Sequence, residues 1–119
     1  MQDFRKRVIW QRAHGFALSI YAASARFPGE ERYGLTSQLR RAVLSIPANI
    51  AEGCGHETNG ELRRFLFVAR GSASEVDYFL LAARDLHMLS PADYVTLGAE
   101  LEHIKRMLAG LIQKLTTDN

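Results

Sequence analysis

Apolar residues recur every three or four positions along most of the chain, which is the spacing of one face of an α-helix. Four such runs are separated by short segments rich in glycine, proline and polar residues. Their inward-facing positions span residues 9–27, 35–50, 62–83 and 94–115. No stretch alternates apolar and polar residues with the period of two that marks a half-buried strand. The pattern therefore predicts an all-α fold of four helices.

Start signals precede the third and fourth runs. Thr58 and Glu61 form a capping-box pattern, in which each side chain bonds the backbone N–H of the other residue. Ser90 stands where an N-cap is expected, and Pro91 follows at the first helical position. Four long helices with short connections favour a single domain over residues 1–119, folded as an antiparallel up-down four-helix bundle.

Large apolar side chains remain outside the inward-facing positions. A bundle helix that is apolar on a second stripe has a second surface to bury. Two explanations stay open: the extra side chains widen the core of one chain, or they form the interface of an oligomer, which we favour. A proline inside the second helix deletes a backbone donor, and we expect it to shape the same interface. The candidate oligomer-interface residues are Trp10, Tyr21, Pro47, Phe65, Phe67 and Phe79.

Four glycines interrupt the predicted helices. Each costs about 1 kcal/mol relative to alanine at an interior helical position. Close approach between helices is the reason that we expect for some of them. They are Gly15, Gly71, Gly98 and Gly110.

Composition narrows the class of protein. The 119 residues are 47% apolar and 24% charged, which is the balance of an ordinary soluble domain. No apolar run approaches the roughly 20 residues that span a bilayer, and no secretory leader pattern is recognisable. The single cysteine, Cys54, cannot form an internal disulfide, in keeping with a reducing compartment. We therefore expect a cytoplasmic protein with no membrane partner.

Patterns that could support catalysis or metal binding are few. Glu100 and His103 have the Glu-x-x-His spacing of di-iron bundles, but such sites need a second motif and two further glutamates. Cys54 and His56 place a thiol near an imidazole, but no acidic residue stands at a spacing that would let it orient the imidazole. Phosphate loops, nucleophile elbows and zinc spacings are missing from the sequence. We predict no enzyme activity, no catalytic residue, no metal and no cofactor. A metalloprotein at Glu100 and His103 is the weakest alternative.

Positive charge is concentrated in the first half of the chain. The part up to His56 has eight Lys/Arg and four Asp/Glu, whereas the remainder has seven and nine. Arginine suits phosphate recognition, but it suits ion pairs between subunits equally well. Two interpretations stay open: a phosphate-tracking surface whose binding weakens with salt, and arginines engaged in solvated or intersubunit ion pairs. The candidate nucleic-acid-binding residues are Arg5, Lys6, Arg7, Arg12, Arg40, Arg41, Arg63, Arg64 and Arg70.

Two long runs, YGLTSQLRR at 33–41 and SIPANIAEG at 45–53, carry a family resemblance. Shorter matching segments are VIWQ at 8–11, RFL at 64–66 and ARGS at 69–72. With these runs, the chain resembles the four-helix bundle family of 23S rRNA intervening sequence proteins. That family includes the accessory variability protein of diversity-generating retroelements. The resemblance covers nearly the whole chain, and its central run is specific.

The resemblance implies a barrel-shaped homopentamer with a connection to nucleic acid. Some members are encoded inside insertions in ribosomal RNA genes, and the retroelement relatives bind nucleic acid and a reverse transcriptase. Arg40, Arg41 and Arg70 match family positions, and the family supplies no catalytic residues. We therefore expect a non-enzymatic, ring-shaped homo-oligomer that binds RNA or DNA backbone. The alternative is an oligomeric adaptor that docks an acidic or reverse-transcriptase-like protein partner without binding nucleic acid.

Overall fold

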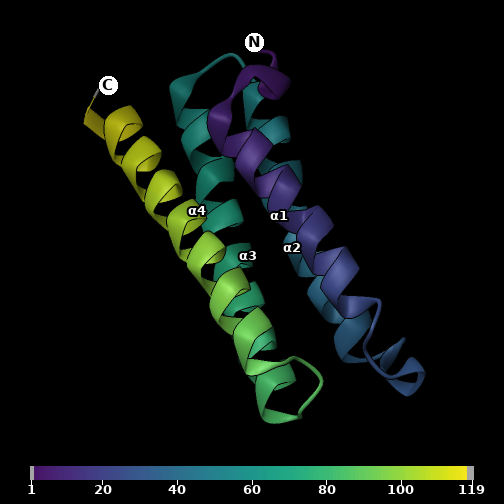
Figure 1. Ribbon diagram of the computed structural model, residues 1–119. Helices are drawn as coiled ribbons and strands as arrows, with labels where there is room; N and C mark the ends of the chain where they lie inside the picture. The colour runs from purple at the N-terminus through teal and green to yellow at the C-terminus, as the bar shows by residue number, and fades with distance from the viewer. Residues whose placement is uncertain (1, 118–119) are drawn as a thin grey trace.

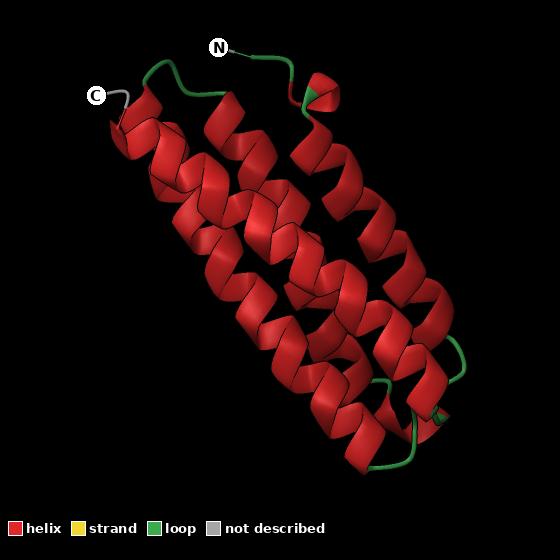
Figure 2. Cartoon of the chain, turned by 60° about the vertical axis from the view of Figure 1, so that its left-hand side comes forward, coloured by secondary structure: helices red, strands yellow, loops and turns green. Residues whose placement is uncertain are grey.

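Four long helices lie side by side in the computed structural model of the chain, which describes residues 2–117 (Figure 1). The helices are α1 (Val8–Ser24), α2 (Leu35–Cys54), α3 (Asn59–Asp85) and α4 (Pro91–Thr117). Two short 3-10 helices, η1 (Phe4–Lys6) and η2 (Gly29–Glu31), precede α1 and α2. Within residues 2–117 there is no strand, as Figure 2 shows. The predicted all-α fold of four helices is confirmed.

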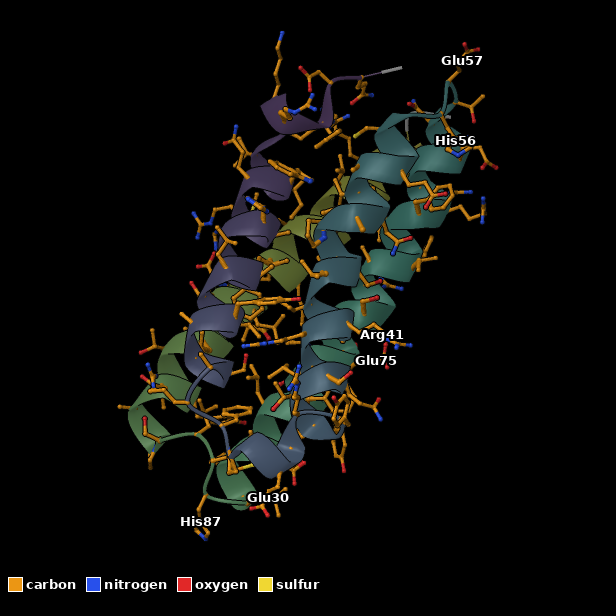
Figure 3. All side chains as sticks on the ribbon, turned by 90° about the vertical axis from the view of Figure 1, so that its right-hand side faces the viewer. Glu30, Arg41, His56, Glu57, Glu75 and His87 are labelled. Atoms are coloured by element: carbon orange, nitrogen blue, oxygen red, sulfur yellow. The ribbon has the colours of Figure 1, made fainter. Side chains whose placement is uncertain are left out.

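Each helix packs against two others, in the cyclic order α1, α2, α3, α4. The most extensive contact joins α2 to α3. Figure 3 shows Glu30 and His87 at one end of the bundle, and His56 and Glu57 at the other. The connections before α2 and α4 therefore share one end, and the connection before α3 lies at the opposite end, with both described chain ends (Figure 1). The result is an elongated bundle of 46 × 22 × 20 Å.

The starts of α3 and α4 carry the caps that the sequence predicts. Thr58 Oγ1 accepts a hydrogen bond from the Glu61 N–H at 3.1 Å, and Ser90 Oγ accepts one from the Asp93 N–H at 3.1 Å. The reciprocal half of the capping box does not form. The Glu61 carboxylate instead lies 3.1 Å from Arg64 Nη2, because a guanidinium is a stronger partner for a carboxylate than a neutral N–H.

The inward-facing positions of the sequence pattern make up the core. Leu66, Val76 and Ile104 are fully buried, and the same cluster reaches every helix. Near the end of α4 Ile112 is buried, whereas Leu111, which follows Leu97 and Ile104 at a strict seven-residue repeat, is half-buried. A helix of 3.6 residues per turn drifts from a strict seven-residue repeat, which accounts for this shift by one position.

Close packing explains one helix glycine and not the four expected ones. A Cβ atom on Gly53 would lie 2.9 Å from Leu62 Cδ1 and 3.1 Å from Phe65 Cβ. A Cβ on any of the four glycines named from the sequence would meet no described atom within 4 Å, apart from its chain neighbours and the nearby backbone of its own helix. Packing inside one chain therefore gives no reason for their presence.

Pro47 is buried in α2, and the helix continues through it. A polar bridge to α3 lies close to it in sequence. Asn49 Nδ2 donates to Ser45 O at 2.8 Å and to Ser45 Oγ at 2.9 Å. The hydroxyls of Ser45 and Ser72 share a hydrogen bond of 2.8 Å between the two helices. This bridge links α2 to α3 beside a position that lacks a backbone donor.

Candidate nucleic-acid interface

Three of the nine predicted cationic residues are neutralised by acids. Arg12 of α1 donates from Nε and Nη2 to the two carboxylate oxygens of Glu100 on α4, at 3.0 and 3.1 Å. This two-pronged bond is the main cause that raises the pKa of Arg12. Arg5 and Arg64 lie 3.5 and 3.1 Å from acids two and three residues away. These charges have local partners and are weak candidates for binding phosphate.

Arg40 is a structural residue of the α1–α2 contact. Its Nε donates to Ser24 Oγ at 2.8 Å and its Nη2 to Tyr21 O at 3.1 Å, at the last turn of α1. The guanidinium carbon also lies 4.5 Å from the centre of the Tyr21 ring. Cations are favourable at the C-terminal end of a helix dipole, so Arg40 caps α1. Its neutral partners leave its positive charge in place.

Two further candidates bond neutral side chains. Arg7 Nε donates to Gln2 Oε1 at 2.7 Å, and Arg63 Nη1 donates to Thr116 Oγ1 at 3.2 Å. The second bond ties α3 to the last turn of α4. Neither bond neutralises the arginine.

Lys6, Arg41 and Arg70 are exposed and form no ion pair within residues 2–117. Arg70 lies over the ring of Phe67, 4.8 Å from its centre. Figure 3 shows Arg41 on the same side of the molecule as Glu75, and the two residues do not pair. These three side chains are free to meet an external anion.

Positive charge is concentrated in one pocket of about 430 Å³, near the end of the bundle where α1 connects to α2. Arg40 and Arg41 from the first turns of α2 line it, together with Arg32 from the turn after η2. Sequence reasoning missed Arg32, because nothing local shows that this turn folds back beside α2. We call this pocket the α2 pocket; its lining is Tyr21, Arg32, Tyr33, Thr36, Ser37, Arg40 and Arg41.

A second, smaller hollow of about 300 Å³ lies between α3 and α4. Arg70 stands on its α3 side, and Gln113 and Thr116 stand on its α4 side. The Arg63–Thr116 bond lies in the same part of the bundle. The nine candidates therefore do not form one surface, and the α2 pocket is the place where three arginines meet.

The six predicted interface residues divide by burial. Phe65 is 8% exposed and Pro47 is buried, so both belong mainly to the core of their own chain. Trp10, Tyr21 and Phe79 are half-buried against the core, and Phe67 is 45% exposed. Exposed apolar residues that the sequence reasoning missed include Leu18, Leu44, Val68 and Tyr78. The apolar surface available to another chain is thus partly different from the predicted one.

The weaker chemical candidates find no support in the geometry. Both carboxylate oxygens of Glu100 are engaged by Arg12. Within residues 2–117 no three His, Cys, Asp or Glu side chains are grouped as a metal site would require. Burial raises the pKa of the Cys54 thiol, and Arg7 offsets part of that rise. His56 stacks on Phe65, with ring centres 5.1 Å apart. A buried, protonated thiol is a poor nucleophile.

No helix in the described part of the chain is long and apolar enough to cross a membrane. Comparison with known proteins adds information about the fold and the family. A crystal structure from Bacteroides thetaiotaomicron, described as a protein of unknown function from the S23 ribosomal protein family, has a similar fold. The TM-score is 0.83 at 21% sequence identity, and the alignment covers 89% of this chain and 96% of that one. None of the curated proteins compared with this chain matches it significantly.

The family match extends over most of the bundle. Residues 5–110 match the family described as 23S rRNA-intervening sequence protein, and this segment includes both long runs of the sequence resemblance and the α2 pocket. The sequence resemblance and the fold therefore agree. The chain belongs to the 23S rRNA-intervening sequence protein family.

Proposed function

We propose that this protein is a non-enzymatic, cytoplasmic, ring-forming bundle that binds the phosphate backbone of RNA or DNA. The α2 pocket is the observation that carries the proposal. Arg32, Arg40 and Arg41 line one small concavity, and none of them forms an ion pair within residues 2–117. Clustered cations without acidic partners raise the local concentration of anions and bind phosphate in a salt-dependent way.

The ring is supported by an exposed face of α3. Phe67, Gly71 and Tyr78 follow one another at steps of four and seven residues, so they lie on one side of the helix, and all are exposed. Gly71 lowers helix stability without any packing reason in its own chain. Contact with a second copy would bury the aromatic rings and use the space above the glycine. We propose a homopentamer of up-down bundles, as the family resemblance implies.

Repetition around a ring would strengthen a modest binding site. The chain has a formal net charge of only +2 at pH 7. One α2 pocket offers three cations, whereas a ring presents several such pockets to the same strand. Linked sites bind with an effective concentration that one site lacks. The proposal therefore joins assembly and binding in one mechanism.

Electrophoretic mobility of a structured RNA against the protein, at about 50 and about 200 mM salt, tests the binding. We expect a shift at low salt and an affinity more than about tenfold weaker at high salt. Absence of a shift at low salt would refute nucleic-acid binding. Light scattering tests the ring, with an expected mass near five times 13.4 kDa. A monomeric mass would refute it.

The mixed charge of the surface favours one alternative, an adaptor that docks an acidic or reverse-transcriptase-like protein. Asp77 of α3 pairs with Lys105 at 2.7 Å and Asp93 of α4 pairs with Arg26 at 3.0 Å, so acids are interspersed with bases. An adaptor would keep its ring and leave RNA unshifted at low salt. That combination of results separates it from the nucleic-acid binder.

A further inference from the structure

The first turn of α2 leaves two backbone donors unpaired, on residues that line the α2 pocket. The Gln38 N–H bonds Gly34 O at 3.1 Å, and the Leu35 N–H bonds Glu31 Oε1 at 3.2 Å. The N–H groups of Thr36 and Ser37, between them, have no hydrogen bond to any residue from 2 to 117. Unpaired donors and the helix dipole together favour an anion at such an end.

A second observation at the same place is independent of the helix end. Thr36 lines the α2 pocket and is only 8% exposed. Its hydroxyl is buried without a hydrogen-bond partner, and within residues 2–117 it is the one buried side-chain polar atom in that condition. An unpaired buried hydroxyl lowers the stability of the ligand-free protein. If the side chain turned about its Cα–Cβ bond toward the pocket, a ligand oxygen would supply the partner.

The charges around these donors favour a phosphate over a neutral ligand. Arg40 is held by its bonds to α1 through Nε and Nη2, which leaves its Nη1 donors without a partner within residues 2–117. Arg41 and Arg32 are exposed on the wall of the same pocket. The Glu31 carboxylate at the helix start removes one unit of positive charge from the three arginines. A phosphate group matches the positive excess that remains.

An aromatic ring stands at the mouth of the pocket. Tyr33 is 87% exposed, and the Arg32 guanidinium carbon lies 5.4 Å from its ring centre. An exposed tyrosine beside an arginine is a surface on which a nucleobase can stack. A ligand that carries both a phosphate and a base would use the helix end and the ring together.

We propose that the α2 pocket binds a nucleotide phosphate through the Thr36 and Ser37 N–H groups, the Thr36 hydroxyl and the flanking arginines, with the base stacked on Tyr33. The nucleotide belongs to a single strand of RNA or DNA, or it is a free mononucleotide. Binding of a nucleotide within a strand rests on the function proposed above, whereas binding of a free mononucleotide does not.

Amide chemical shifts of the full chain give a direct test. Inorganic phosphate, adenosine monophosphate and a single-stranded RNA decamer are titrated separately against labelled protein. All three probes should shift the Thr36 and Ser37 amides to saturation. The Thr36→Val variant should melt at a higher temperature without ligand and bind phosphate about tenfold more weakly, because the unpaired hydroxyl is removed. Thr96→Val, the same change at an exposed threonine of α4, is the matched control and should alter neither property.

Tyr33→Ala provides a second arm that does not depend on a buried residue. It should weaken the monophosphate and the RNA severalfold while leaving inorganic phosphate unchanged. The inference is overturned if the Thr36 and Ser37 amides do not shift, or if Thr36→Val binds phosphate as well as the wild type. RNA binding without those shifts would overturn it and leave the proposed function standing. Shifts with phosphate and the monophosphate but without RNA binding would support the pocket and overturn the proposed function.

Discussion

Arg40 of α2 donates from Nε to Ser24 Oγ of α1 at 2.8 Å, and Ser24 Oγ in turn donates to Ile20 O at 2.7 Å. Ser24 is buried, so this chain of bonds lies inside the contact between the two helices. An arginine that the sequence offers as a candidate nucleic-acid contact is therefore also part of the fold. Its neighbour Arg41 is exposed and makes no such bond.

Substitution of Arg40 should affect stability. Arg40→Ala removes two hydrogen bonds from a charged donor and leaves the Ser24 hydroxyl without that donor, which should lower the free energy of unfolding by about 1.5–3 kcal/mol. Arg41→Ala removes no bond and should stay within about 0.5 kcal/mol of the wild type. Urea denaturation at one fixed protein concentration measures both. Equal losses in the two variants would contradict the structural role of Arg40.

Arginines without acidic partners should set the salt dependence of RNA binding. The slope of log affinity against log salt reports how many phosphates the protein neutralises, so Arg41→Gln and Arg70→Gln should each reduce it by about one. Arg12→Gln is the control, because the Arg12 charge is already matched by Glu100. Binding titrations at several salt concentrations give the slopes. A larger effect of Arg12→Gln than of the other two would place the binding surface elsewhere.

Two glycines should respond oppositely to alanine. Gly53→Ala would bring a Cβ to 2.9 Å from Leu62 Cδ1, and we expect the overlap to cost about 1–3 kcal/mol. Gly71→Ala meets open space in its own chain and should stabilise an isolated bundle by about 1 kcal/mol. Thermal melts compare the variants, and light scattering follows their assembly. Retention of the full ring mass by Gly71→Ala would show that this position lies outside the ring contact.

The buried thiol predicts a loss of stability at alkaline pH. Burial raises the pKa of Cys54 in the folded chain, so above the ordinary thiol pKa of about 8.5 the unfolded chain releases its proton first. The free energy of unfolding should therefore fall as pH rises from about 8 to 10. Cys54→Ala should show a shallower fall over the same interval, measured by urea denaturation. Parallel curves would mean that the thiol titrates alike in both states.

Local signals in the sequence predicted the helices well. Thr58 and Ser90 cap the helices that follow them because a cap depends only on residues three positions away. The apolar spacing identified the core for the same reason, since a helix face depends on the helical repeat alone. The predicted bond from the Thr58 N–H to the Glu61 carboxylate does not form, because Arg64 on the next turn is a charged competitor for that carboxylate.

The partners of the arginines could not be predicted in this way. Arg40 bonds residues 16 and 19 positions earlier, and Arg12 bonds a residue 88 positions later. Such pairs depend on which helices become neighbours and on their rotation about their axes. The α2 pocket also depends on the turn that carries Arg32, which follows no helical period. The hydrogen-bond donors of the α2 pocket can therefore be identified only from the three-dimensional structure.

The first turns of α2, which line the α2 pocket, and the two described chain ends lie toward opposite ends of the bundle, whose long axis is 46 Å (Figure 1). A tag joined beside either described end is therefore carried far from the pocket. The protein can be anchored to a sensor surface by either end while the arginines face the solution. If the ring copies point the same way, all their tags gather on one face and all the pockets open on the other.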